Sequence, residues 1–217
     1  MRITVTGRAN TRLRPELATL SLRVGFESTT PGAALEQATT LANAVGDALD
    51  ELDAADPCPV ESTALLPLTT DSWRPWGSDG NQLPLRYRAN ARATLVFNDF
   101  RALSRFIDRW GREEGVSVEG VEWSLSQARK ADETRSILGA AVADARARAL
   151  ALAVAAGEDG VRFVELSDTP FRGNDAEPRM YARAAMAAGG AGNGDGIDLT
   201  PEDIELDAVV YAVFTTD

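Results

Sequence analysis

Several stretches of the chain alternate hydrophobic and polar residues with a period of two, which predicts strands with one face in a core. The clearest case is 17–27, where one side carries Ala18, Leu20, Leu22, Val24 and Phe26. Alternation of the same kind, weak at 2–7, predicts further strands at 85–97, 116–127 and 203–215, and apolar, β-branched residues predict strands at 60–72 and 161–167. Polar residues between the hydrophobic ones in 17–27 and 85–97 indicate a sheet with one solvent-facing side.

Hydrophobic residues spaced by three and four predict three helices between these strands. The first follows Thr30, the expected N-cap, with Pro31 at its first position. The second is expected to start at Asp99, and the third spans about 130 to 156, with Gly157 at its end. The predicted buried stripe of the third helix is Leu138, Val142, Ala145, Ala149, Leu152 and Ala156. On its exposed side, we expect Asp144 and Arg148 to pair one turn apart.

This order of elements predicts an α+β fold. The simplest arrangement is a single mixed or antiparallel sheet with helices packed on one face. Within it, a ferredoxin-like βαββαβ unit is followed by a long helix and two further strands. No stretch has the composition of a linker between domains, so we expect one domain over 1–217. Its least periodic part, about 170–200, is rich in Gly and Ala and is predicted to be a flexible loop.

The amino-acid composition argues against several classes of catalytic and binding site. The chain has no histidine, one cysteine, 22 basic and 33 acidic residues, and a formal net charge of −11. Without histidine there is no Ser-His-Asp or Cys-His arrangement and no His-based metal site. The acidic balance argues against nucleic acid as a partner, because phosphate binding needs a basic face. Cys58 has no partner for an intrachain disulfide. We therefore predict no metal, no cofactor and no catalytic residue.

The sequence also bears on location. The first residues lack an apolar stretch long enough for a signal peptide, and no segment approaches the ~18 apolar residues of a membrane span. We therefore expect no membrane span and a cytoplasmic protein, or a periplasmic or secreted one if a leader has been removed.

Trp73 and Trp76 flank Arg74 and Pro75 in the turn-rich stretch 71–84. Exposed aromatic side chains at the tip of a hairpin are able to anchor a partner or another subunit. Alternatively, both rings fold back over the sheet edge as a small separate core. These two tryptophans are the candidate partner contact.

Acidic residues offer three weaker candidates. Glu113-Glu114 and Asp132-Glu133 are adjacent acids that would suit acid/base catalysis if they converged, but adjacent acids near helix ends are usually solvated. The third candidate, Asn193, Asp195, Gly196 and Glu202, matches positions 3, 5, 6 and 12 of a calcium-binding loop. Ala191 stands where that pattern normally has Asp, so an acidic loop is the simpler interpretation.

The start ITVTGRA, the strand ATLSLRV, the run YRANARATLVFNDF, the helix AVADARARALALA and the closing TPEDIELDAVVYAVF resemble the SIMPL-domain family in the same order. That family is largely of unknown function and includes bacterial periplasmic immunogenic proteins and a mammalian adaptor of a signalling kinase. The resemblance implies an α+β domain without known catalytic residues, and homo-oligomeric assembly, ring- or channel-like in some members. It provides no active-site residues to assign here.

Three functions follow as hypotheses. The first is a non-enzymatic, self-associating SIMPL-like protein, acting as a scaffold or a stress-related accessory, with a homo-oligomer as its assembly. The second is a small-molecule binding module with a pocket under 71–84 or 170–200. The third is a hydrolase that uses carboxylates alone.

Overall fold

The computed structural model describes residues 1–171 and 199–216, whose contacts divide into two compact units. Of the described residues, unit 1 contains 1–15, 125–171 and 202–216, and unit 2 contains 16–124 and 199–201. Each unit has its own sheet and its own hydrophobic core. The α+β class predicted from the sequence is confirmed.

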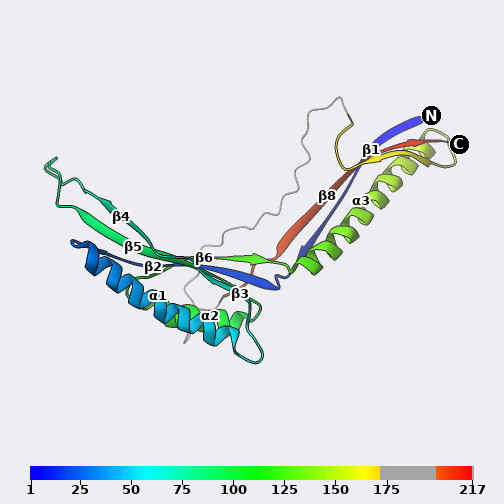
Figure 1. The fold of residues 1–217 in the computed structure, drawn as a ribbon. Helices are drawn as coiled ribbons and strands as arrows, with labels where there is room; N and C mark the ends of the chain where they lie inside the picture. The colour runs from blue at the N-terminus through cyan, green and yellow to red at the C-terminus, as the bar shows by residue number, and fades with distance from the viewer. Residues whose placement is uncertain (172–198, 217) are drawn as a thin grey trace. The chain divides into compact units, whose positions relative to one another are not determined.

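Unit 2 is an antiparallel sheet with two helices. Its elements are β2 (Leu17–Ser28), α1 (Pro31–Asp53), β3 (Val60–Leu65), β4 (Thr69–Trp73), β5 (Arg86–Phe97), α2 (Phe100–Trp110) and β6 (Val116–Ser124). The strand order is β3-β5-β2-β6, and β4 pairs with the first half of β5. Both helices lie on the same face of this sheet (Figure 1).

The alternating residues of β2 and β5 explain why the helices lie there. Leu20, Leu22 and Val24 of β2 and Leu95 and Phe97 of β5 are fully buried against α1 and α2. The opposite face is polar, with Arg23 and Arg92 both paired to Glu119. The register shifts between Ser21 and Leu22, which pair with Gly120 and Val118, so β6 has an irregularity next to Gly120.

Unit 1 pairs the two ends of the chain. Its elements are β1 (Arg2–Leu13), α3 (Gln127–Ala155), β7 (Arg162–Ser167) and β8 (Ile204–Thr215). The strand order is β1-β8-β7, all antiparallel, and β1 and β8 pair along their whole length. The helix α3 runs along β1 and β8 (Figure 1).

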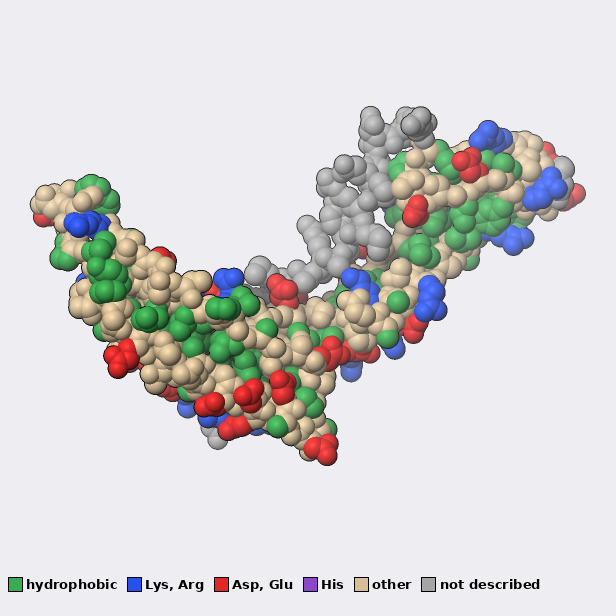
Figure 2. All heavy atoms as spheres, in the orientation of Figure 1, with side chains coloured by type: hydrophobic (Ala, Val, Ile, Leu, Met, Phe, Trp, Pro, Cys, Tyr) green, Lys and Arg blue, Asp and Glu red, His purple; other side chains and the backbone are tan. Residues whose placement is uncertain are grey.

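The buried face of α3 differs from the predicted one. Its buried residues recur every four positions and are Ile137, Ala141, Ala145, Ala149 and Ala153. The predicted stripe shares only Ala145 and Ala149 with this set, while Leu138 and Leu152 are exposed. Figure 2 shows hydrophobic side chains on the surface along this helix. The small side chains face the sheet because α3 lies too close to β1 for larger ones.

Gly7 marks the point of closest approach between β1 and α3. A Cβ atom at Gly7 would collide with the carbonyl oxygen of Ala141 and lie 2.7 Å from the Cβ of Ala145. On either side of Gly7, the Asp144 carboxylate accepts a hydrogen bond from the Arg8 N–H (2.9 Å), and Arg148 donates to the Thr6 carbonyl oxygen (3.0 Å). The predicted pair between Asp144 and Arg148 is therefore wrong, because both side chains bind backbone groups of β1.

The prediction of a single sheet is also wrong. The first and last strands pair with each other instead of extending the sheet of unit 2, and α3 covers them with a separate core. The single domain over 1–217 stays a prediction, because compact units defined by contacts need not fold separately. Most of the flexible loop predicted at 170–200 lies outside the described residues.

Candidate functional site

A cavity of about 350 Å³ opens in unit 2 between the start of α1 and the paired strands β4 and β5. We call it the α1–β4 pocket. Its lining residues are Pro31, Gly32, Leu35, Thr70, Asp71, Ser72, Tyr87, Arg88 and Ala89. This volume lies in the range of small-molecule sites, roughly 300–1,000 Å³. The pocket adjoins the stretch 71–84 that the sequence singled out.

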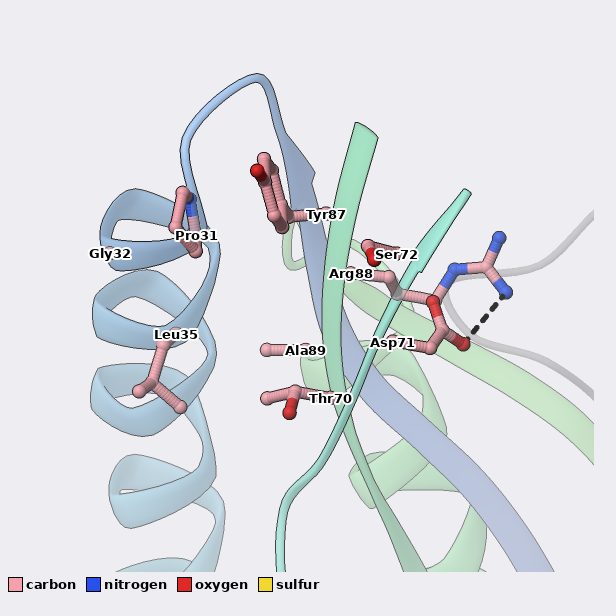
Figure 3. A pocket seen from close by; sticks show the side chains of 9 residues that line it. All are labelled: Pro31, Gly32, Leu35, Thr70, Asp71, Ser72, Tyr87, Arg88 and Ala89. Carbon is pink, nitrogen blue, oxygen red and sulfur yellow. Dashed lines mark ion pairs between the residues drawn. The ribbon is translucent and has the colours of Figure 1, made fainter. Parts of the chain in front are cut away.

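The strand register decides which side chains face the cavity. Thr70 pairs with Ala89, and Ser72 pairs with Tyr87. Paired residues of antiparallel strands share a face, so these four side chains project toward α1, as Figure 3 shows. Deeper in, Ala89 packs on Ala34 and Ala38 of α1, which closes the inner end of the cavity.

The opposite side of β4 and β5 carries the charges. Arg88 Nε lies 3.0 Å from Glu27 Oε1, and Arg88 Nη1 lies 3.9 Å from Asp71 Oδ2. The Arg88 guanidinium also lies over the Trp73 ring, 4.4 Å from its centroid. In Figure 3, Asp71 and Arg88 point away from α1. Their charges are thus paired with each other and with Glu27 outside the cavity.

The two tryptophans of the sequence analysis differ in environment. Trp73 is half-buried at the end of β4 under Arg88, whereas Trp76 is 68% exposed and forms an isolated bridge with Gln82. Leu83 is also exposed in the same turn region. The structure thus places Trp73 with Arg88 on the side of β4 and β5 that faces away from α1, and leaves Trp76 on the surface. Their role as a partner contact stays a prediction.

The turn beyond Trp76 is closed by hydrogen bonds. Asn81 donates from its side-chain amide (2.8 Å) and from its backbone N–H (3.2 Å) to the Asp79 carboxylate. The side-chain bond, followed by the backbone bond, lowers the pKa of Asp79 below the ordinary value for an aspartate. Gly77 N–H also donates to Asn81 O (2.8 Å).

Glu113 and Glu114 lie together in the connection from α2 to β6. They line a groove of about 490 Å³ with Glu36, Gln37 and Thr40 of α1, over a floor of Phe26, Leu41 and Ala44. The acid pair of the sequence analysis thus gains a third glutamate from another element. In residues 1–171 and 199–216, no three His, Cys, Asp or Glu side chains are placed to hold a metal ion.

The remaining candidates do not come together. Asp132 and Glu133 form separate ion pairs on the surface of α3, with Arg135 (2.5 Å) and Arg129 (3.0 Å). Cys58 is exposed between α1 and β3. Of the calcium-loop pattern, Asn193, Asp195 and Gly196 lie outside the described residues, and Glu202 is half-buried just before β8.

Sequence reasoning missed a second surface, the edge strand β7 of unit 1. Phe163, Val164 and Leu166 of this strand are 39%, 59% and 50% exposed. Phe163 stacks on the buried Phe214 of β8, with ring centroids 4.3 Å apart. The signal was present in RFVELS, where three of six residues are large and apolar without strict alternation. Only the sheet order shows that this strand is an edge.

These features describe an α+β protein with two sheets and, in unit 2, a small cavity with mixed polar and apolar walls. Among the described residues, no helix combines the length and apolarity needed to cross a membrane.

The chain belongs to the SIMPL family, described as a protein of unknown function (DUF541), whose family model matches residues 3–214. The match includes both units and confirms the resemblance found in the sequence. None of the curated proteins matches the chain.

Proposed function

We propose that the protein is a non-enzymatic, self-associating member of its family, acting as a scaffold or a stress-related accessory. The observation that carries this proposal is the edge strand β7. Among the described strands it pairs with β8 alone, and three of its six residues are large, apolar and exposed. Exposed apolar edge strands are templates for pairing with another chain, and natural proteins normally protect them.

The other edge strand of the same sheet, β1, is partly protected by side chains of α3. There, Asp144 and Arg148 of α3 bind the outward N–H of Arg8 and the outward C=O of Thr6. Among the described residues, α3 packs mainly on β1 and β8 rather than on β7. Pairing of β7 with β7 of a second copy would satisfy the backbone groups of both edges around a two-fold axis and bring apolar side chains of the two strands next to each other on each face of the sheet.

The non-enzymatic part of the proposal depends on the sequence. A chain without histidine and without a recognisable nucleophile motif lacks the groups that most often carry proton transfer and covalent catalysis. The family, being of unknown function, supplies no activity.

We further propose that unit 2 is ferredoxin-like. Its elements β2-α1-β3-β5-α2-β6 follow the βαββαβ order, and in the sheet order β3-β5-β2-β6 the strands of the two βαβ halves alternate. The short strand β4 is an addition to that motif. The cytoplasmic location remains a prediction.

Light scattering coupled to gel filtration over micromolar concentrations tests self-association. We expect a mass that is a multiple of 23.2 kDa for the natural chain, and a shift toward one chain for Val164→Lys. Val118→Lys is the matched control, because Val118 is also exposed on an edge strand but belongs to β6 of unit 2. A natural chain that is strictly monomeric, or an equal effect of both variants, would contradict the proposal.

One structural feature supports the alternative hypothesis of a hydrolase that uses carboxylates alone. This feature is the groove lined by Glu36, Glu113 and Glu114. Retaining and inverting glycosidases place two carboxyl groups on either side of the scissile bond. Hydrolysis of a chromogenic glycoside that is lost in Glu113→Gln, with the fold intact, would favour this alternative over a non-enzymatic role.

A further inference from the structure

The α1–β4 pocket has walls of two kinds. Leu35, Pro31 and Ala89 are apolar, and Leu35 remains 44% exposed although its spacing places it on the core stripe of α1. Thr70, Ser72 and Tyr87 each bring a hydroxyl group from β4 or β5. None of these three hydroxyls has a hydrogen-bond partner among the described residues. The cavity thus combines uncovered apolar surface with three free donors and acceptors.

Gly32 contributes no side chain to the lining of the cavity. Gly32 lines it from the first turn of α1, and a Cβ atom built there would have no atom within 4 Å. In Figure 3 the side chains of Leu35, Thr70 and Ala89 face one another across this space. A Cβ atom at position 32 would therefore meet no neighbouring atom, and we use a leucine there to narrow the cavity.

The charged residues of the lining indicate whether the cavity suits a charged or an uncharged ligand. The charged residues of the lining, Asp71 and Arg88, point away from α1 and are paired with each other, and Arg88 is also paired with Glu27. Most of the lining is exposed, so a charged ligand would keep part of its hydration, but the water that it did lose would not be offset by an ion pair with a free countercharge. An uncharged ligand would release water from its apolar surface, which is favourable. Its polar group would exchange hydrogen bonds to water for hydrogen bonds to the three hydroxyl groups.

We propose that the α1–β4 pocket binds a small uncharged molecule with a ring or compact apolar body and a hydroxyl or carbonyl group. The body lies between Leu35 and Tyr87, and the polar group bonds to the hydroxyls of Thr70 and Ser72. This site is separate from β7, so it goes beyond self-association and does not depend on it.

Three probes with the same hydroxyphenyl ring test the charge of the ligand: 4-ethylphenol is neutral, tyramine is a cation and 4-hydroxyphenylacetate is an anion. Saturation-transfer NMR and titration on the full chain measure their binding. We expect 4-ethylphenol to bind about tenfold more tightly than either charged probe. Tighter binding of a charged probe, or no binding of any probe, would overturn the proposal.

Gly32→Leu tests whether the ligand binds in the α1–β4 pocket. It should abolish binding of 4-ethylphenol while circular dichroism and the unfolding midpoint show an intact fold. Gly139→Leu is the matched control, because Gly139 is also in a helix with no atom near its Cβ position, but on α3. Thr70→Val, which keeps the shape and removes one hydroxyl, should weaken binding by about two- to tenfold. Full binding in Gly32→Leu would overturn the assignment of the site. Light scattering on the same samples reports self-association separately.

Discussion

Arg148 donates a hydrogen bond to the carbonyl oxygen of Thr6 at 3.0 Å, so a helix side chain completes the backbone bonding of an edge strand. Asp144, one turn earlier on α3, accepts from the N–H of Arg8 at 2.9 Å. Thr6 and Arg8 flank Gly7, where the helix comes closest to β1. Two backbone groups on one edge of the unit 1 sheet are thereby bonded within the chain, while α3 packs mainly on β1 and β8 rather than on β7 among the described residues.

Asp144→Ala should expose the N–H of Arg8 to water. We expect faster hydrogen exchange of the Arg8 amide and a loss of about 1 kcal/mol in the free energy of unfolding, the usual size of one hydrogen bond. Asp132→Ala is the control, because Asp132 is on the same helix but pairs only with Arg135 on the surface. It should change the free energy of unfolding by less than about 0.5 kcal/mol. Equal effects of the two variants would contradict the role of Asp144.

Gly7→Ala should destabilise the protein. The added methyl group would collide with the backbone of α3 at Ala141 and with Ala145, and such overpacking costs about 1–3 kcal/mol. Urea unfolding followed by circular dichroism measures the change. Gly139→Ala, at a helix position with open space, should instead raise stability by up to about 1 kcal/mol. A neutral Gly7→Ala variant would mean that α3 is free to move away from β1.

Gly115→Ala should cost more than Gly157→Ala, although both glycines have a positive φ, 87° and 85°. The backbone conformation alone costs an L residue about 1–2 kcal/mol. At Gly115 the methyl group would also lie 2.6 Å from two ring atoms of Phe26, whereas the space at Gly157 is open. Thermal unfolding of both variants measures the difference. Equal losses would show that the Phe26 ring yields without cost.

Asn81→Ala should raise the pKa of Asp79. The Asn81 amide and N–H stabilise the charged carboxylate, and the variant removes the side-chain bond. Because the pKa of Asp79 is lowered in the folded state, its contribution to the closed turn is present above the ordinary aspartate pKa. That contribution is lost as the pH falls through the lowered value. Carbon NMR titration of the Asp79 carboxyl group in both proteins checks this, and an unchanged midpoint would contradict it.

Most strand and helix positions were predictable from local patterns, but β1 continues to Leu13 where a strand at 2–7 was expected, and the expected strand 60–72 is divided into β3 and β4. Alternation in 17–27 corresponds to β2, and Asp99 caps α2 by accepting from the N–H groups of Arg101 and Ala102, as expected. Thr30 is the N-cap of α1 as predicted, but its side chain makes no capping hydrogen bond. The buried face of α3 was not predictable in this way. A hydrophobicity pattern assigns leucine to the buried face, whereas the close approach of α3 to β1 at Gly7 leaves space only for alanine side chains.

The α1–β4 pocket was predicted only in outline, as a cavity under 71–84. Its walls come from three separate parts of the chain, and the register that sets Thr70 opposite Ala89 and Ser72 opposite Tyr87 is a property of strand pairing. The two-sheet division depends in the same way on the pairing of β1 with β8 over residues 2–13 and 204–215. A local sequence pattern does not indicate which distant strand becomes the neighbour of a given strand in the sheet.

The alanine face of α3 also determines how unit 1 loses its structure. Alanine has no side-chain rotamers to restrict, so Ala141, Ala145, Ala149 and Ala153 pack on the sheet with almost no loss of conformational entropy. Each of these methyl groups also removes little apolar surface from water, about 0.8 kcal/mol per group. Unit 2, with Phe97, Leu95 and Leu103 fully buried, gains more for each residue. We therefore expect unit 1 to open first, with the amides of β1 and β8 exchanging before those of β2 and β5.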